Sequence, residues 1–100
     1  MDEVTVFKAL ANASRLQILQ LMRQPERHFG AMPNGQFRDG RVCVGEIQKK
    51  LGLCQSTASQ YLAQLQQAGL IRAERSCQWT FYVRNEGTLR EVEQFMNQKL

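Results

Sequence analysis

The chain has 100 residues, of which 43% are hydrophobic and 22% are charged, a composition that favours one folded domain over a disordered segment. It contains no apolar run of about 18 residues and no basic-then-apolar leader, so we expect a cytoplasmic protein without a membrane partner. Its three cysteines are too few and too irregularly spaced for a disulfide framework, which predicts free thiols.

The positive charge is concentrated in the middle of the chain. Residues 41–84 hold six basic and two acidic side chains, whereas the remainder of the chain holds seven of each. The whole formal charge of +4 therefore belongs to one segment. A basic surface of this kind attracts polyanions such as nucleic acid, although a charge of +4 is by itself ordinary for a small domain.

Hydrophobic spacing and capping residues predict a mainly α-helical fold with about five helices and one β-hairpin. The expected elements, in chain order, are helices over 2–11, 13–23, about 44–51 and 55–69, strands over 70–75 and 79–84, and a helix over about 87–99. Asn12 is the expected N-cap of the second helix. Gly52 and Gly69 are expected to end the third and fourth helices.

The segment 24–41, with the sequence QPERHFGAMPNGQFRDGR, has two prolines, three glycines and no helical periodicity, so it predicts a long loop. A loop of this length is uncommon inside a compact domain and often has a function. Its Phe29, Met32 and Phe37 need apolar surroundings. We favour packing on the core over the alternative, a small-molecule pocket.

The helix over 55–69 carries five glutamines and no charged side chain. At 100° per residue its apolar face consists of Ala58, Tyr61, Leu62, Leu65 and Ala68. The opposite face is polar and neutral. Such side chains suit the reading of base edges, because Gln can bind adenine through two hydrogen bonds, whereas charges bind phosphate at any sequence. The alternative interpretation is that this polar face is only solvated, or that it packs against another protein in an assembly.

The helix over 44–51, the turn LGLC and the neutral helix form a helix-turn-helix pattern, and a basic hairpin follows it. The residues expected to read bases are Gln55, Ser56, Ser59, Gln60 and Gln64. The residues expected to contact the DNA backbone are Thr57, Lys49, Lys50, Arg72, Arg75 and Gln78.

Three stretches resemble the ArsR/SmtB family of bacterial repressors. FKALANASRLQILQLM is similar to the opening of that family, VCVGEIQKKLGLCQSTASQYLAQLQQAGLI to its recognition unit, and WTFYVR to the second strand of its wing. The resemblance covers nearly all of the chain outside 24–41, a segment longer than the usual connection. It implies a single winged helix-turn-helix domain over residues 1–100, with the helix-turn-helix at 44–69 and the wing at 70–84. It also implies a homodimer that binds an inverted-repeat operator in double-stranded DNA and represses transcription.

The chain departs from the family pattern in two places. Gln60 and Tyr61 stand where a basic residue and a histidine are common. Ser76, Cys77 and Gln78 replace the usual Asp-Gly-Arg-like tip of the wing. Contact between the wing and the minor groove is therefore not implied by the resemblance.

The terminal helices carry apolar stripes beyond what one small core can cover. Their members are Val4, Phe7 and Leu10 in the first helix and Leu89, Val92, Phe95 and Met96 in the dimerisation helix over 87–99. We expect these helices to pair across a two-fold axis.

The metal ligands of the family are not matched. Its Cys-x-Cys site on the third helix corresponds here to Cys43 with Gly45 at the second position, and the last helix has no histidine. One cysteine cannot form a tetrahedral thiolate site, so we expect neither a metal nor a cofactor. Cys43 and Cys54 lie near helix N-termini, where the helix dipole can lower a thiol pKa, and both remain candidate redox sensors. For Cys43 we favour a small buried side chain, and Cys54 is equally well interpreted as a weak N-cap.

Three classes of function fit the sequence to different degrees. A DNA-binding repressor accounts for the basic segment, the neutral helix face and both amphipathic terminal helices. The alternatives are a redox-responsive repressor that uses Cys43 or Cys54, and a winged-helix protein-interaction module. An enzyme is not expected, because the sole histidine, His28, lies in a Gly/Pro-rich segment and no Ser or Cys has a recognisable base beside it. The sequence identifies no small-molecule or redox effector.

Overall fold

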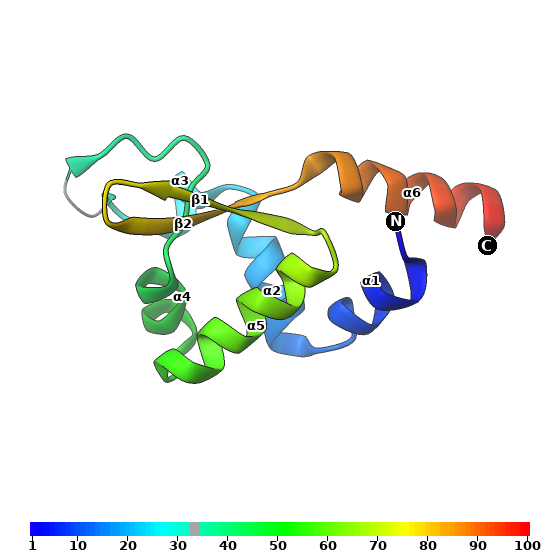
Figure 1. Ribbon diagram of the computed structural model, residues 1–100, viewed down its shortest axis with the longest axis horizontal. Coiled ribbons are helices and arrows are strands. Elements are labelled where there is room, and N and C mark those ends of the chain that lie inside the picture. Colours follow the sequence, from blue (N-terminus) through cyan, green and yellow to red (C-terminus); the bar gives the residue numbers. More distant parts are fainter. Residues whose placement is uncertain (33–34) are drawn as a thin grey trace.

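The fold is mainly helical, with one hairpin that projects from the helices (Figure 1). It is known from a computed structural model that describes residues 1–32 and 35–100. The elements in this part are α1 (Glu3–Leu10), α2 (Ala13–Met22), α3 (Pro25–His28), α4 (Val44–Leu51), α5 (Gln55–Gln67), β1 (Ile71–Ser76), β2 (Trp79–Arg84) and α6 (Glu86–Lys99). No helix in this described part combines the length and the apolar character needed to cross a bilayer.

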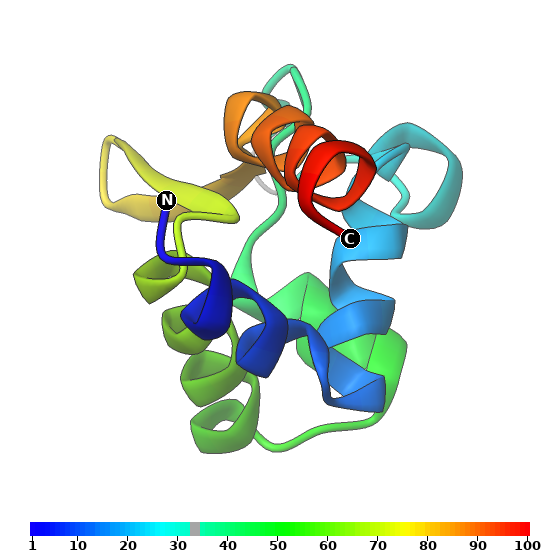
Figure 2. The same ribbon diagram turned by 90° about the vertical axis from the view of Figure 1, so that its right-hand side faces the viewer.

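The molecule is elongated, with principal extents of 44 × 25 × 23 Å. Helices α1 and α6 lie at one end, and the hairpin tip, α4 and the start of α5 lie toward the other (Figure 1). Viewed from the end that carries α6, the terminal helices lie in front of the rest of the fold (Figure 2). This separation places the terminal helices at the opposite end of the molecule from the hairpin tip and the start of α5 (Figure 1).

Helix α5 is the central packing element and contacts α1, α2, α4 and β1. Ala58, Leu62 and Leu65 are fully buried, which confirms the apolar face expected from the spacing. Burial of this one stripe removes apolar surface from water while the other side of the helix stays hydrated. Gly69, with a φ of +79°, ends the helix as expected because glycine adopts this left-handed conformation without steric strain.

Arg15 joins three helices, a role that the sequence did not reveal. Asn12 caps α2 as expected, since its side-chain oxygen accepts a hydrogen bond from the Arg15 backbone N–H at 2.9 Å. The Arg15 guanidinium donates to the carbonyl oxygens of Ala9 at 2.7 Å and Lys8 at 3.1 Å. Carbonyls at a helix C-terminus have no partner within the helix, and Arg15 supplies one for the end of α1.

The hairpin pairs β1 with β2 in antiparallel register from Ile71 opposite Arg84 to Ser76 opposite Trp79. Phe81 is fully buried, in agreement with the strand alternation, although β1 begins one residue later than expected. The turn residue Cys77 has a φ of +58°, a conformation that costs a residue with a side chain about 1 kcal/mol or more.

A further strand-like contact was not anticipated. Val42 forms an isolated antiparallel bridge with Tyr82. The Val42 N–H donates to the Tyr82 carbonyl at 2.9 Å, and the Tyr82 N–H donates back at 2.7 Å. The hairpin is therefore attached at its middle to the chain that leads into α4.

The prediction of a long loop over 24–41 was wrong for the four residues of α3. Helix α3 opens the segment with Pro25 at its first position, where the missing N–H costs nothing because first-turn amides have no partner within the helix. Four residues are too few to show a helical period, so the pattern could not reveal this turn. Phe29 and Met32 are buried as expected, but Phe37 is 81% exposed and does not pack on the core.

Residues 35–41 are attached to α4 by Arg38, the buried charged residue of the described chain, which is 6% exposed. Its guanidinium donates to both carboxylate oxygens of Glu46, at 2.6 and 3.2 Å. It also donates to the carbonyls of Gly30 and Arg41, both at 2.7 Å. Glu46 in turn accepts from the Cys43 N–H at 3.1 Å, which satisfies a free amide at the start of α4.

Candidate nucleic-acid interface

The exposed face of α5 is polar and carries no charge. Gln55, Ser56, Ser59 and Gln60 are all exposed at its N-terminal half. Thr57 is half-buried, and its hydroxyl lies 3.2 Å from the Cys54 sulfur. Because α5 follows α4 through a short turn, α5 has the place of the second helix in a helix-turn-helix.

Gln64 must be removed from the base-reading set. Its side-chain oxygen accepts a 2.7 Å hydrogen bond from Arg15 of α2, and the residue is half-buried. The Arg15 guanidinium also lies over the Tyr61 ring, 5.7 Å from its centroid. Gln64 therefore helps to fix the packing of α5 on the first two helices, and its position at the boundary of the polar face had hidden this role.

Two of the six central basic residues are bound within the molecule. Arg84 forms an ion pair with Glu86 at 2.9 Å and donates to the Leu19 carbonyl at 2.8 Å. Arg41 donates to the carbonyls of Phe37 and Arg38, and its guanidinium lies 5.0 Å from the centroid of the Phe81 ring. The four that remain exposed are Lys49, Lys50, Arg72 and Arg75.

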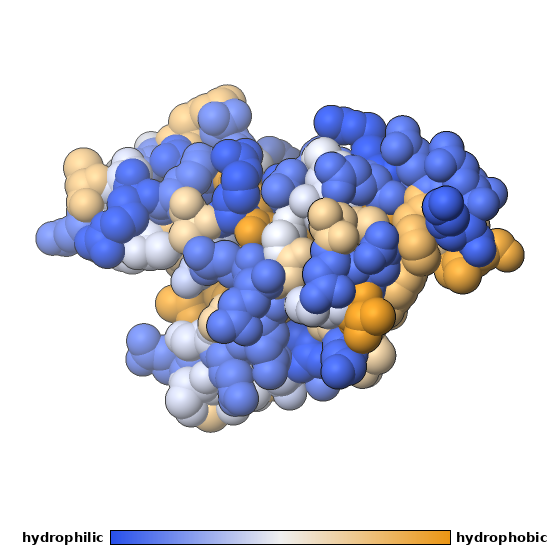
Figure 3. Space-filling model, turned by 45° about the vertical axis from the view of Figure 1, so that its right-hand side comes forward, coloured by the Kyte–Doolittle hydropathy of each residue, from blue (hydrophilic) through white to orange (hydrophobic). Residues whose placement is uncertain are grey.

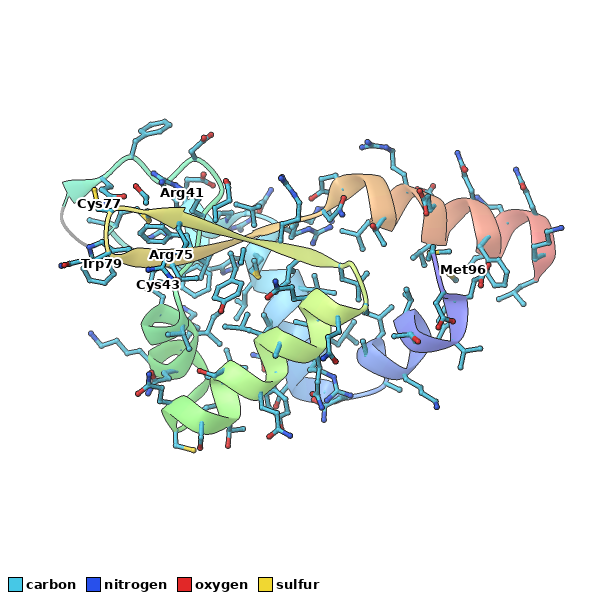
Figure 4. The ribbon with its side chains drawn as sticks, in the orientation of Figure 1. Arg41, Cys43, Arg75, Cys77, Trp79 and Met96 are labelled. Atoms are coloured by element: carbon cyan, nitrogen blue, oxygen red, sulfur yellow. The ribbon has the colours of Figure 1, made fainter. Side chains whose placement is uncertain are left out.

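These four exposed cations come from two elements on either side of the neutral helix in the sequence. The lysines end α4, and the arginines belong to β1. Arg75 lies near the far end of the hairpin, close to the tip that carries Cys77 (Figure 4). Gln78 is exposed in the same turn. Positive charge therefore lies on α4 and β1, the elements before and after α5, whose own exposed face carries no charge.

The two cysteines of the helix-turn-helix differ in their chemistry. Cys43 is buried, and burial raises the pKa of its thiol. Cys54 is exposed before the first turn of α5, where the Ser56 hydroxyl at 3.4 Å and the Thr57 hydroxyl at 3.2 Å lower the pKa of its thiol to about 7. A group with this pKa is about half thiolate at neutral pH, so Cys54 is the more reactive of the two.

A second surface lies on the terminal helices. Phe7 and Phe95 contact each other with ring centroids 6.1 Å apart, which ties α1 to α6 within the chain. Val92 was assigned to the dimer face, but it is 7% exposed and belongs to the core of its own chain. Leu10 and Leu89 pack partly against that core.

Uncovered apolar side chains on this surface include Val4, 63% exposed, Met96, 50% exposed, and Leu100, 83% exposed. Apolar surface gathers beneath the C-terminal half of α6 (Figure 3). Figure 4 shows Met96 on the side of α6 that faces α1, at the opposite end of the molecule from the hairpin tip. A contiguous apolar patch on a small domain indicates a protein contact.

Metal ligands do not converge in the described residues. Across residues 1–32 and 35–100, no group of three or more His, Cys, Asp or Glu side chains is placed to hold an ion. The absence of a metal site stays a prediction.

Comparison with known proteins gives concordant results. The model of the bacterial regulatory proteins of the arsR family matches residues 36–73. The uncharacterised HTH-type transcriptional regulator YbzH of Bacillus subtilis is 45% identical over the full length of both chains. The transcriptional activator HlyU of Vibrio cholerae is 35% identical over 79% of this chain and 59% of its own length.

Solved structures of similar proteins share the fold. Reduced HlyU from Vibrio cholerae matches with a TM-score of 0.62 and 30% identity, over 96% of this chain and 86% of its own. The homodimeric winged helix-turn-helix DNA-binding domain of Mb0332 from Mycobacterium bovis, a possible ArsR-family regulator, matches with a TM-score of 0.68 and 32% identity. That match covers 95% of this chain and 76% of the other.

Proposed function

The chain belongs to the ArsR family of bacterial regulatory proteins and has the winged helix-turn-helix fold, and we propose that it is a homodimeric repressor that reads an inverted repeat in double-stranded DNA. One observation carries the proposal. The exposed face of α5 holds no charge, whereas the neighbouring α4 and β1 hold four exposed cations. This is the division that sequence-specific DNA binding requires.

The two groups of residues have different tasks. Gln55, Ser56, Ser59 and Gln60 offer donors and acceptors whose partners on base edges depend on the sequence. The exposed lysines of α4 and arginines of β1 bind phosphate, which adds affinity at any sequence and fixes the position of the protein. Because the side chains on the exposed face of α5 are neutral, they add little affinity for DNA of any sequence, and the difference in affinity between sequences stays large.

Assembly through the terminal helices completes the proposal. Val4 and Met96 expose apolar surface at the end of the molecule away from the hairpin tip, and a two-fold axis there would cover it. Such pairing sets two recognition helices about 34 Å apart, one turn of DNA. The Mb0332 domain is homodimeric, which supports the same arrangement here.

Repression follows from occupancy alone. A dimer that covers promoter DNA blocks transcription without further contacts, so the described surfaces suffice for it. HlyU, a similar protein, is an activator, so the sign of regulation needs its own measurement. The measurement is the expression of a promoter–reporter fusion in cells with and without this gene. For a repressor, we expect higher expression in the cells that lack the protein.

The central experiment is selection of duplexes from a random library by the purified protein, followed by titration of the selected site at several salt concentrations. We expect an inverted repeat whose binding constant falls steeply with salt. A protein-interaction module, the second candidate, would select no motif. Recovery of no motif, or binding that salt leaves unchanged, would exclude the proposed function.

A further inference from the structure

A pocket of about 350 Å³ lies between α4 and the chain at the end of α3. Residues 28–31 form one wall, and Glu46, Lys49 and Lys50 form the other. We call it the α3–α4 pocket. It exists because the long segment 24–41 folds back on α4, where Arg38 fastens it to Glu46.

The lining of this pocket has an excess of positive charge. Lys49 and Lys50 are both exposed and carry no ion pair in the described residues. Glu46 is the one acid of the lining, and its carboxylate is already engaged by the Arg38 guanidinium and the Cys43 N–H. His28, half-buried at the end of α3, adds an imidazole N–H donor at the opposite wall.

Two lysines and a histidine line this one pocket, and their side chains suit a phosphate group. Lysine binds phosphate as a point charge, and histidine can add a directed hydrogen bond. The first helix of a helix-turn-helix crosses the DNA backbone, and α4 is that helix here. A phosphate of the DNA backbone that binds the lysines of α4 would therefore lie at the pocket that His28 also lines.

We propose that the α3–α4 pocket binds a phosphate group, with His28 as a contact that the segment 24–41 adds to Lys49 and Lys50. The DNA backbone is the source of phosphate that the position on α4 favours, and a free phosphate is the other source of the same chemistry. The preference for the DNA backbone over free phosphate rests on the proposed function, whereas the binding of a phosphate group in the pocket does not.

Two substitutions at one position form a matched pair. His28→Glu places a carboxylate opposite the lysines, whereas His28→Gln has nearly the same size and keeps an N–H donor. Arg27→Gln is the control for net charge, because Arg27 is the exposed neighbour on α3 and does not line the pocket. All three are titrated against the selected duplex at 0.1 M salt and over a salt series.

We expect His28→Glu to weaken duplex binding about fivefold to tenfold and to lower the salt slope by about one, the effect of one lost phosphate contact. His28→Gln and Arg27→Gln should stay within about twofold of the unaltered protein. Equal binding by the His28→Glu and His28→Gln proteins overturns a backbone contact at this pocket, while the proposed function stands as long as the duplex is still bound.

The sole histidine of the chain also gives a direct reading of the pocket, because its imidazole has a unique NMR signal. Inorganic phosphate is added at constant pH to the protein without DNA, and in a second sample the duplex is added. A saturable shift with phosphate, lost in Lys50→Gln, identifies free phosphate as a ligand. A shift with duplex alone, also lost in Lys50→Gln, identifies the backbone. No shift in either sample overturns the proposal. A protein that binds phosphate but no duplex would keep the pocket and refute the proposed function.

Discussion

Arg38 and Glu46 form an ion pair in which both side chains are largely out of water, with exposed fractions of 6% and 15% and a shortest distance of 2.6 Å. The Glu46 carboxylate serves two partners at once, because it also accepts from the Cys43 N–H at the start of α4. The pair therefore fixes the segment 24–41 and the first turn of the helix-turn-helix in one arrangement.

Loss of one member of this pair should destabilise the protein strongly. Arg38→Met keeps an apolar stem but leaves the Glu46 carboxylate without its cation, and we expect a loss of about 3 kcal/mol or more in the free energy of unfolding. Urea denaturation followed by circular dichroism measures it. Arg27→Met, on the exposed face of α3, is the control and should change the stability by less than about 0.5 kcal/mol. A loss below about 1 kcal/mol in Arg38→Met would show that the pair does not hold the segment.

Substitutions on the neutral face and on the basic elements should have different effects on DNA binding. Gln60→Ala should change the selected sequence and cost about 1–3 kcal/mol on the original site. Arg75→Ala should weaken all duplexes alike and lower the salt slope by about one. Gln66→Ala, at the other end of α5, is the control for loss of a glutamine. An unchanged motif with Gln60→Ala would refute the base-reading face.

The thiol of Cys54 should react at lower pH than that of Cys43. Hydrogen bonds from Ser56 and Thr57 lower the Cys54 pKa to about 7, so its thiolate fraction, and the rate of alkylation by iodoacetamide, should rise between about pH 6 and 8. Burial raises the Cys43 pKa and slows its reaction. Mass spectrometry after short exposures follows each site. Cys54→Ser should abolish this labelling, and Ser56→Ala should move the midpoint upward. A midpoint near that of an ordinary thiol in the unaltered protein would contradict the assignment.

The same reaction reports on the interface. An adduct on Cys54 stands beside Gln55 and Ser56 and should weaken duplex binding, whereas bound duplex should slow the alkylation. The redox-responsive alternative is tested in the same samples with peroxide. We expect only a modest effect of peroxide on DNA binding.

The apolar surface of the terminal helices should determine the assembly state. Light scattering at micromolar concentration should give the mass of two chains, each of 11.5 kDa. Met96→Glu places a charge in the apolar patch and should yield a monomer with weak DNA binding, because a single half-site remains. Gln98→Glu adds the same charge to an exposed polar position of α6 and should remain a dimer. A monomeric unaltered protein would remove the proposed two-fold arrangement.

Metal ions should not release the protein from its DNA. Cys43 is buried with a raised pKa, and the described residues bring no second and third ligand to it. We expect zinc, cadmium and arsenite at stoichiometric concentration to leave an operator complex intact in a fluorescence anisotropy titration. Cys43→Ser serves as the matched variant. Stoichiometric release that this substitution abolishes would contradict the prediction.

The parts of the fold that could be predicted are those in which one element carries its own signal. The apolar stripe of α5 repeats over four turns, so the burial of Leu62 and Leu65 follows from spacing alone. The caps at Asn12 and Gly69 are equally local. The exposed cations of α4 and β1 also needed no tertiary knowledge, since lysine and arginine stay in water unless a partner holds them.

The parts that could not be predicted depend on partners distant in the sequence. Arg38 lies in a Gly/Pro-rich segment, where a charge is usually solvated, and only the fold brings the Glu46 carboxylate to it. Gln64 resembles its neighbours on the polar face until Arg15, far away in the chain, binds its oxygen. The sequence did contain a signal for the contact between Glu46 and the Cys43 N–H, because Glu46 follows Cys43 at the spacing of a capping box.

The hairpin is held at two levels, by Arg84 at its base and by the bridge from Val42 to Tyr82 at its middle. Beyond that bridge, the exposed side chains of Cys77 and Gln78 make no hydrogen bond or ion pair with the residues that the structure describes. Residues at the tip can therefore diverge among descendants of this gene while the scaffold is conserved. A change of either tip residue should therefore leave the hairpin and its attachment to the rest of the fold in place.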